Sequence, residues 1–166
     1  DEKSKLFYNS VISASEREAG YILDGLLHNK DIDSDMHSTD THGYSEIIFG
    51  VCNSLGILFA PRIKNYNDQL LYTFKDFPRN TYESKGYKIL PSKSMYIDES
   101  IIKEQWENIL RLLCSIKLGE VKASIILKRL SSYSKQHPLY KAMKEIGRIH
   151  KTLFLTITII LMFLIF

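Results

Sequence analysis

Residues 47–61 read IIFGVCNSLGILFAP and contain the clearest change of pattern in the chain. In the first part, apolar residues recur at three- and four-residue steps, which is typical of a helix with one buried face. Gly56 then permits the left-handed backbone that ends many helices. Ile57 to Ala60 are apolar, as in a short buried strand, and Pro61 closes that strand. The stretch therefore predicts a helix that is followed directly by a strand.

The residues before this stretch repeat the alternation of strand and helix. Residues 6–14 are rich in Phe, Tyr, Val and Ile and predict a strand. Ser15 and Glu18 have the spacing that closes the start of a helix reciprocally. Apolar residues from Ala19 to Leu27 give this helix one buried face. An alternating order of strands and helices predicts an α/β fold, in which helices cover a sheet.

The second half of the chain has a different, helical pattern. Residues 64–98, between the halves, form a connection rich in Tyr and Lys, whose length suggests a function. Over residues 102–116 the apolar residues follow helical steps, which predicts one helix with Trp106 in the core. Two further helices are predicted, one over residues 121–130 and one that begins at Pro138.

These patterns divide the chain into four segments: an α/β core over 1–63, a connecting insertion over 64–100, a helical segment over 101–155 and an apolar tail over 156–166. The tail has two explanations. A membrane anchor needs about twenty apolar residues, and Thr152 to Phe166 is shorter than that. A shifted reading frame after Leu155, which replaces an amphipathic helix by arbitrary sequence, is the favoured explanation. Membrane association is therefore not expected.

The composition limits the class of protein. The chain has 166 residues, 45% hydrophobic and 25% charged, as expected of one globular domain. A formal net charge of +3 is too small by itself to indicate a nucleic-acid-binding protein. Cys52 and Cys114 lie among apolar residues, with no neighbouring Cys or His for a zinc site, so we expect buried, reduced thiols. Such thiols favour a cytoplasmic location.

The stretch His37-Ser38-Thr39-Asp40-Thr41-His42-Gly43-Tyr44 places a carboxylate among hydroxyls and imidazoles, just before the predicted helix. Two interpretations are open. Asp40 or Thr41 can cap the helix that follows. Alternatively, Asp40 is a metal ligand, because Mg²⁺ binds one or two carboxylates and leaves room for water and a substrate phosphate. Its expected position at the end of a strand, where α/β sheets usually bind ligands, favours the metal ligand.

Several blocks of sequence, the Asp40 motif among them, resemble the catalytic region of Tn-three-type transposases, the large replicative enzymes of class II bacterial transposons. The blocks, in order, are Phe7-Tyr8-Asn9-Ser10-Val11-Ile12-Ser13, Tyr21-Ile22-Leu23-Asp24-Gly25-Leu26-Leu27, Thr39-Asp40-Thr41 with Gly43-Tyr44, Gly56 through Phe59-Ala60-Pro61-Arg62-Ile63, Ser131-Ser132-Tyr133 and Gly147-Arg148-Ile149. The resemblance covers Leu6 to about Phe154. Several blocks in the family's order are far more specific than a single short motif.

The resemblance implies a partial ribonuclease-H-like, integrase-type fold followed by an all-helical segment. It also implies an Asp-Asp-Glu triad that binds two Mg²⁺ ions for strand cleavage and strand transfer on DNA. Asp40 matches the second aspartate of that triad. The first aspartate of the family lies upstream of the matched region, and its glutamate lies downstream of the Gly147 block. Glu120 precedes the Ser131 block, which is the wrong order. We therefore expect a chain that is catalytically incomplete.

Basic residues are the candidates for DNA contact. Arg62 and Lys64 follow the predicted strand, on the side of the sheet expected for Asp40, where they can bind DNA phosphates and position the DNA. The alternative is a pair of solvated surface charges. A basic bias in the helical half can follow a DNA backbone or simply face solvent. Its members are Lys128, Arg129, Lys135, Lys141, Lys144, Arg148 and Lys151.

The sequence therefore predicts a fragment of a DNA transposase in which Asp40 is one Mg²⁺ ligand. The expected partner is double-stranded DNA, at transposon ends and in the target, and the intact enzyme is a candidate homodimer. No small-molecule substrate is expected. The alternatives are a non-catalytic DNA-binding or dimerising remnant and, third, a small tail-anchored membrane protein.

Overall fold

The computed structural model describes residues 19–28, 36–39, 44–132 and 137–165. The strand predicted over residues 6–14, the predicted helix start at Ser15, and Asp40 itself lie outside these described residues. The predicted strand and the helix start therefore stay predictions.

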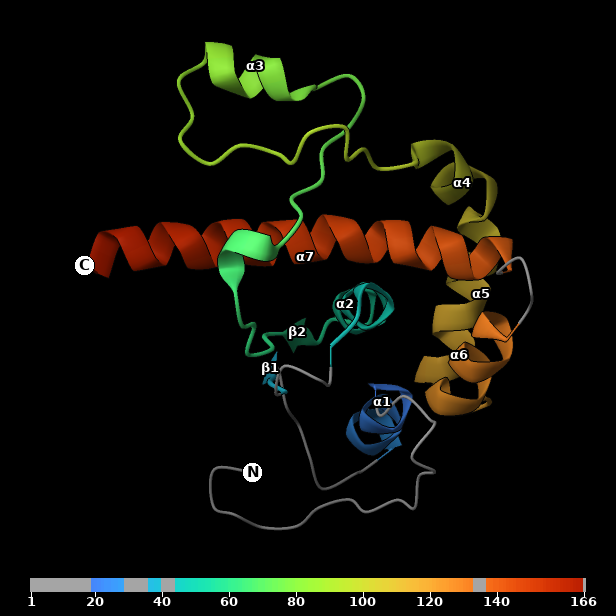
Figure 1. Cartoon of the computed structure of the whole chain (residues 1–166). Coiled ribbons are helices and arrows are strands. Elements are labelled where there is room, and N and C mark those ends of the chain that lie inside the picture. Colours follow the sequence, from blue (N-terminus) through green and yellow to red (C-terminus); the bar gives the residue numbers. More distant parts are fainter. Residues whose placement is uncertain (1–18, 29–35, 40–43, 133–136, 166) are drawn as a thin grey trace.

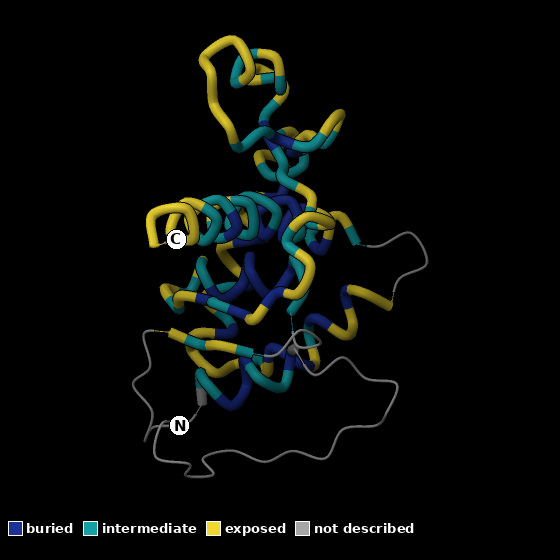
Figure 2. Tube along the Cα trace, turned by 60° about the vertical axis from the view of Figure 1, so that its left-hand side comes forward, coloured by how far each residue is buried: buried dark blue, intermediate teal, exposed yellow. Residues whose placement is uncertain are grey.

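Most of the described chain is helical, and it contains one small parallel sheet (Figure 1). The elements are α1 (Ala19–His28), β1 (Met36–His37), α2 (Glu46–Ser54), β2 (Leu58–Phe59), the 3-10 turn η1 (Tyr66–Asp68), α3 (Arg79–Ser84), α4 (Glu99–Glu104), α5 (Trp106–Lys117), α6 (Ala123–Ser131) and α7 (Pro138–Ile165). Helix α7 crosses the whole molecule. The connection that carries α3 lies on one side of it, and α1, α2 and the sheet lie on the other (Figures 1 and 2).

The sheet and α2 form a strand–helix–strand unit. β1 and β2 are parallel, with Met36 opposite Leu58 and His37 opposite Phe59. Because parallel neighbours need a crossover connection, α2 passes from the end of one strand to the start of the other. This unit confirms the expected α/β character in its coarse form. The fuller ribonuclease-H-like arrangement stays a prediction.

The end of α2 is formed as its sequence predicts. The helix ends at Ser54, and Gly56 has a φ angle of +85°, in the region that favours glycine. The Ile57 N–H donates to the Cys52 carbonyl at 2.9 Å, which turns the chain into β2. The predicted helix, glycine stop and strand are therefore confirmed.

Phe49 is the centre of the core. Its ring lies edge-on to Phe59 of β2, with centroids 4.9 Å apart, and 5.7 Å from the ring of Phe154 on α7. Phe49 is fully buried. One aromatic side chain thus joins the sheet, α2 and α7, and its burial contributes roughly 1.5–3 kcal/mol of hydrophobic stabilisation.

Helices α2 and α7 touch through their backbones. A Cβ atom built on Gly147 would lie 1.6 Å from the Glu46 carbonyl oxygen, and one built on Gly50 would lie 2.6 Å from the Met143 carbonyl oxygen. Both distances are far inside van der Waals contact. The crossing therefore requires glycine on both helices, and any larger residue at either position must separate them.

Ion pairs and hydrogen bonds also connect α2 and α7 where the two helices cross. Glu46 Oε2 pairs with Arg148 Nε at 3.3 Å and with Lys144 Nζ at 3.7 Å, while the Tyr72 hydroxyl donates to Glu46 Oε1 at 3.1 Å. Arg148 also pairs with Glu145, and its guanidinium lies 4.9 Å above the Tyr72 ring. We call these five residues the Glu46 cluster. Burial raises the pKa of Tyr72, and the nearby carboxylate of Glu46 raises it further, which keeps the phenol a donor.

The helix predicted over residues 102–116 is divided, because α4 ends at Glu104 and α5 begins at Trp106. The core position predicted for Trp106 is wrong, since 51% of its surface is exposed. The buried positions are Gln105, Ile109, Leu112 and Ile116, which also follow steps of four, three and four. The buried face therefore contains Gln105 in place of its neighbour Trp106, which falls on the solvent side.

The two cysteines differ. Cys52 is buried in α2, and burial raises the pKa of its thiol to about 12. Cys114 is exposed, contrary to the prediction. It lies on α5 outside the buried face of that helix, so its apolar neighbours in the sequence did not indicate burial. The other two helical predictions are confirmed, because α6 spans Ala123–Ser131 and α7 begins at Pro138.

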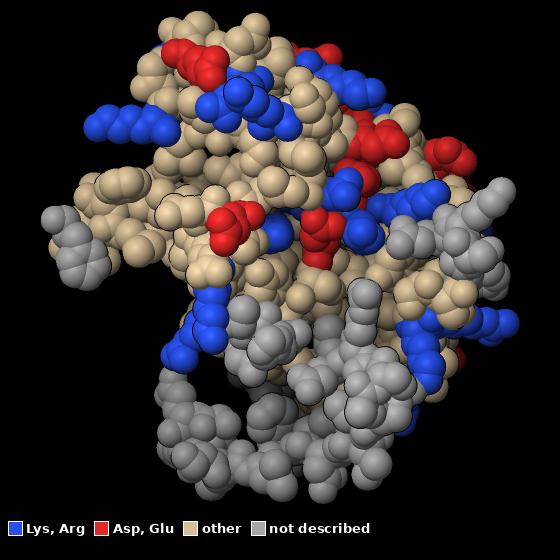
Figure 3. Space-filling view, in the orientation of Figure 1, with Lys and Arg blue, Asp and Glu red and all other residues tan. Residues whose placement is uncertain are grey.

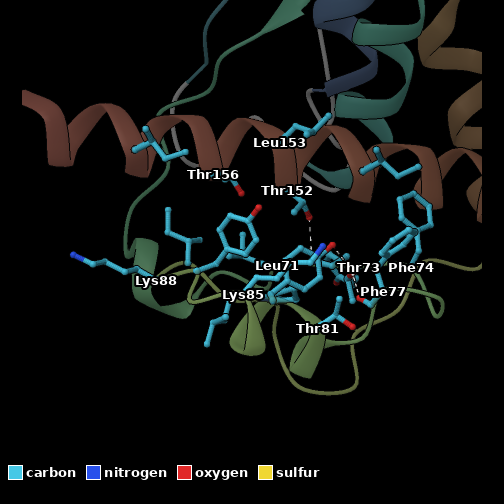
Figure 4. A pocket seen from close by; sticks show the side chains of 18 of the residues that line it. Leu71, Thr73, Phe74, Phe77, Thr81, Lys85, Lys88, Thr152, Leu153 and Thr156 are labelled. Atoms are coloured by element: carbon cyan, nitrogen blue, oxygen red, sulfur yellow. Dashed lines mark hydrogen bonds between the residues drawn. The ribbon is translucent and has the colours of Figure 1, made fainter.

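An apolar groove lies between α7 and the connection that precedes α4 (Figure 4). Its volume is about 820 Å³, and its lining includes Leu71, Phe77, Leu153 and Ile160. The Tyr72 N–H donates to Thr152 Oγ1 at 3.0 Å, which ties the connection to the helix. The connection is thus folded against α7 rather than extended away from it.

Helix α7 continues without a break through Leu155 to Ile165, and its last part is apolar and exposed (Figures 2 and 3). By length and composition it could cross a membrane, which is weak evidence for a spanning helix. Its first half packs on α2, with Met143 and Ala142 fully buried. In the second half of the helix Leu155 is buried, and continuous exposure begins only at Ile160 and extends to Ile165.

Replacing Gly147 by alanine tests the backbone contact. In an ordinary helix the Gly147→Ala change would stabilise by about 1 kcal/mol. Here the methyl group meets the Glu46 carbonyl, so we expect a loss of about 1–3 kcal/mol or more in the free energy of unfolding, measured by urea denaturation. Lys141→Ala, at an exposed position of the same helix, is the control and should change stability by less than about 0.5 kcal/mol. Unchanged or increased stability of Gly147→Ala would contradict the close crossing.

A double-mutant cycle of Glu46→Gln and Arg148→Gln tests the ion pair between these residues. The two side chains are only 19% and 25% exposed, so we expect a coupling energy of about 0.5–3 kcal/mol in urea denaturation. The matched control is the Glu107–Arg111 pair on α5, which is 85% and 76% exposed and should couple by less than about 0.5 kcal/mol. Additive effects at Glu46 and Arg148 would show that their ion pair contributes nothing.

Candidate functional site at the end of the parallel strands

The carboxyl ends of the two parallel strands lie side by side. Beyond the strands themselves, the Ala60 N–H donates to the His37 carbonyl and the Arg62 N–H donates to the Thr39 carbonyl, each at 2.8 Å. Pairing therefore continues to Thr39, the residue that immediately precedes Asp40 in the sequence. Ligand sites of α/β sheets form at this edge. Asp40 itself lies outside the described residues, so its predicted role is not tested here.

The start of α2 bears on the capping interpretation of the Asp40 motif. The helix begins at Glu46, and its N-cap residue is Ser45, whose side chain makes no capping hydrogen bond. Ser45, rather than Asp40 or Thr41, thus occupies the N-cap position, and the metal-ligand role of Asp40 stays a prediction. Glu46, the first residue of the helix, pairs with Arg148 and Lys144.

Two buried polar atoms at the strand end have no hydrogen-bond partner in the described part of the chain. They are Nε2 of His37 and Oγ1 of Thr39. The His37 ring stacks on Phe59 at 6.1 Å, and burial lowers the pKa of His37, so its imidazole is neutral near pH 7. A buried polar group without a partner costs about 1–3 kcal/mol. Such atoms call for an explanation, and a ligand at the strand end is one.

Arg62 and Lys64 directly follow β2, and both are exposed. They alternate with Pro61 and Ile63, which are buried, so the extended chain turns the two basic side chains toward solvent. Neither forms an ion pair with a residue in the described ranges. Their backbone position beside Thr39 agrees with the predicted placement near Asp40, and DNA contact stays a prediction.

A pocket of about 430 Å³ opens at the start of α2. It is lined by Tyr44, Ser45, Glu46, Ile47, Ser131, Tyr140, Lys144 and Lys151. Two of the lysines that the sequence assigned to a basic helical face, Lys144 and Lys151, thus lie beside the residues that follow the Asp40 motif. On the face shown in Figure 3, basic and acidic residues are interspersed rather than separated into one basic surface.

The Glu46 cluster was missed by sequence reasoning. Its partners Glu46 and Arg148 are 102 positions apart, so no local spacing signals the pair. Two signals were available in the sequence. Glu46 lies in the first turn of a helix, shortly after the Asp40 motif. Arg148 belongs to the Gly147-Arg148-Ile149 block that resembles the family. Arg148 is therefore an internal partner of Glu46 rather than a free DNA-contact residue.

The described residues offer little for a metal ion. No three His, Cys, Asp or Glu side chains gather among them. The buried hydroxyl of Thr39, the residue before Asp40 in the sequence, has no hydrogen-bond partner among the described residues. A carboxylate is the kind of oxygen ligand that Mg²⁺ prefers, and the role of Asp40 as such a ligand stays a prediction.

Comparisons with known proteins give the family. The model of the Tn3 transposase DDE domain matches residues 1–158. The transposase of transposon Tn1546 from Enterococcus faecium is 40% identical over 153 residues, which are 90% of this chain and 15% of that protein. The transposase of transposon Tn2501 from Escherichia coli is 42% identical over 150 residues, which are 90% of this chain and 14% of that protein.

The transposase of transposon Tn21 from Escherichia coli is 36% identical over 150 residues, again 90% of this chain and 15% of that protein. The chain thus spans about one seventh of the length of these relatives. The match to the family model covers nearly the whole chain and confirms the family predicted from the sequence blocks. This chain belongs to the Tn3 transposase DDE domain family.

Proposed function

We propose that this chain acts in DNA transposition, as part of the catalytic region of an enzyme that cleaves DNA at transposon ends and joins the ends to target DNA. Family membership supports the general activity, because the relatives are named as transposases. The observation that carries the site is the pairing of the Arg62 N–H with the Thr39 carbonyl, which brings a basic residue beside the residue before Asp40.

Asp40 is the proposed ligand of a divalent cation, Mg²⁺ in the cell. Two observations support this role. Asp40 follows in sequence a residue at the carboxyl edge of the parallel sheet, and the buried hydroxyl of that residue, Thr39, has no hydrogen-bond partner in the described part of the chain. A cation held there would polarise a DNA phosphodiester and stabilise the charge that develops on it.

Arg62 and Lys64 are the proposed contacts to the DNA backbone. Both side chains are exposed at the sheet edge, and neither is occupied by an acidic partner in the described part of the chain. A guanidinium and an ammonium at this place bind phosphate oxygens, which fixes the position of DNA without selecting its sequence.

Two Mg²⁺ ions need several carboxylates, and the described residues contain no group of three acidic or metal-binding side chains. We propose that further acidic ligands, ribonuclease-H-like surroundings and a second subunit complete the two-metal site in the intact enzyme. The proposed location is the bacterial cytoplasm, where its DNA partner lies.

The second candidate is a non-catalytic DNA-binding role. It is favoured by the lysines that line the pocket at the start of α2, because they can hold a DNA backbone without any metal. This role needs Arg62 and Lys64 but not a cation at Asp40, so metal binding separates the two candidates.

Binding of Mn²⁺ to the full chain tests the proposed ligand. We expect weak binding, detected by water-proton relaxation, that Asp40→Ala reduces severalfold, because one carboxylate provides most of the site's charge. Asp68→Ala, at an exposed position outside the site, is the matched control and should bind as the unmodified chain does. Equal weak binding by the unmodified chain and by Asp40→Ala would count against the metal site and favour the non-catalytic role.

A further inference from the structure

We propose that the pocket at the start of α2 binds a phosphate group of a nucleic-acid strand, through Lys144, Lys151 and the hydroxyl of Tyr140. We call it the α2 pocket; it has the 430 Å³ volume and the lining described above. The choice of a nucleic acid as the source of the phosphate rests on the proposed function. The anion site itself rests on the donors that converge in the pocket.

Tyr140 supplies the observation that calls for a ligand. The residue is only 5% exposed, and it lines the α2 pocket from α7. No hydrogen bond of its hydroxyl is found among the described residues. The phenol of a tyrosine that lines a cavity and has no such partner can donate to a bound oxygen. An oxyanion in the pocket satisfies that donor.

Lys151 provides a cation without a carboxylate partner. Its Nζ lies 5.7 Å from the centroid of the Tyr44 ring, and among the described residues it forms no ion pair within 4.0 Å. Burial lowers the pKa of Lys151, although the more distant charge of Glu46 opposes this. A partly desolvated ammonium is weakly stabilised, and a bound anion restores the interactions that it has lost in water.

Lys144 provides a second cation that can turn toward an anion. Its Nζ is 3.7 Å from Glu46 Oε2, an oxygen that Arg148 already holds at the shorter distance of 3.3 Å. The side chain of Lys144 is 31% exposed. Glu46 is therefore neutralised by Arg148 and hydrogen-bonded by Tyr72 even when Lys144 leaves it. The carboxylate in the pocket wall does not exclude an anion.

The backbone of α2 adds donors at the same place. The first helical hydrogen bonds are those from the N–H groups of Ile48 and Phe49 to the Ser45 carbonyl, at 3.1 and 3.2 Å. The N–H groups of Glu46 and Ile47 precede these bonds, and the Ser45 side chain does not cap them. Free amides at a helix start favour anions through hydrogen bonding and the helix dipole.

The position of the α2 pocket connects it with the proposed catalytic edge. Tyr44 and Ser45 follow Asp40 by four and five residues. A strand whose phosphate lies in this pocket therefore passes close to the end of β1. The pocket holds a phosphate that does not react, and in this way it positions the strand.

Binding of a fluorescently labelled DNA duplex to the full chain, followed by anisotropy at several salt concentrations, tests the pocket. We expect Lys151→Gln to weaken binding roughly three- to tenfold and to reduce the salt slope by about 1, because one phosphate contact is lost. Tyr140→Phe, which keeps the ring, should weaken binding roughly threefold with an unchanged salt slope. Lys117→Gln, at an exposed lysine of α5 that does not line the pocket, should change the affinity less than twofold.

Inorganic phosphate is the second probe, because it separates a free anion from a DNA strand as the source. We expect phosphate to compete with DNA for the unmodified chain and to compete less well for Lys151→Gln. Thermal denaturation of each variant confirms that it folds. DNA affinities of Lys151→Gln and Tyr140→Phe that equal that of Lys117→Gln would overturn the proposal.

An Arg62→Gln variant keeps this test independent of the proposed function. If Arg62→Gln weakens DNA binding and Lys151→Gln does not, the α2 pocket is not a phosphate site and the proposed catalytic edge stands. If phosphate binding depends on Lys151 but DNA does not bind the chain, the anion site stands and its assignment to DNA is overturned.

Discussion

The contact between the backbones of α2 and α7 is the constraint on which the other features depend. Gly147 brings α7 against the Glu46 carbonyl, and Gly50 brings α2 against the Met143 carbonyl. At this spacing Phe49 reaches both β2 and α7. The crossing also fixes where α2 begins. Since α2 joins β1 to β2, the same contact holds the carboxyl edge of the sheet, where Thr39 and Arg62 pair.

The basic residues of α7 near α2 fall into two groups: those whose charge is neutralised by acidic residues, and those whose charge is available to a ligand. Arg148 is surrounded by Glu46 and Glu145 and stacks on Tyr72, so its charge stabilises the crossing. Lys151 lies on the same helix, where it contacts the Tyr44 ring and forms no ion pair within 4.0 Å with a described residue. Cations of one helix therefore have two different roles. A basic residue that packs inside the fold adds little to DNA affinity, whereas one without an acidic partner has its charge available for a phosphate.

Local signals explain which parts of the fold could be predicted. The α2 stop at Gly56, the strand that follows and the start of α7 at Pro138 depend on glycine, proline and apolar spacing, and all three were confirmed. Trp106 and Cys114 were predicted to be buried and are exposed. Gln105 and Trp106 both lie at helical spacing from the buried Ile109, and tertiary packing buries Gln105, a choice that no local pattern encodes.

The candidate site, like the fold, was predictable only where local sequence signals determine it. The strand end before Asp40 and the exposed Arg62 and Lys64 follow from the alternating order of elements, and the described residues agree with it. The α2 pocket was not predictable, because Ser45 and Tyr140 meet only in the folded chain. Sequence spacing can place a residue at the end of an element, but it cannot show which distant side chain lies opposite.

Amide hydrogen exchange of the full chain, with and without a DNA duplex, tests most directly whether the strand end and the start of α2 form one nucleic-acid surface. The account predicts slower exchange on DNA binding at residues 37–39, 60–64 and 44–47, and unchanged exchange in α5. Protection confined to the apolar groove between α7 and residues 71–91, or to α5, would contradict it.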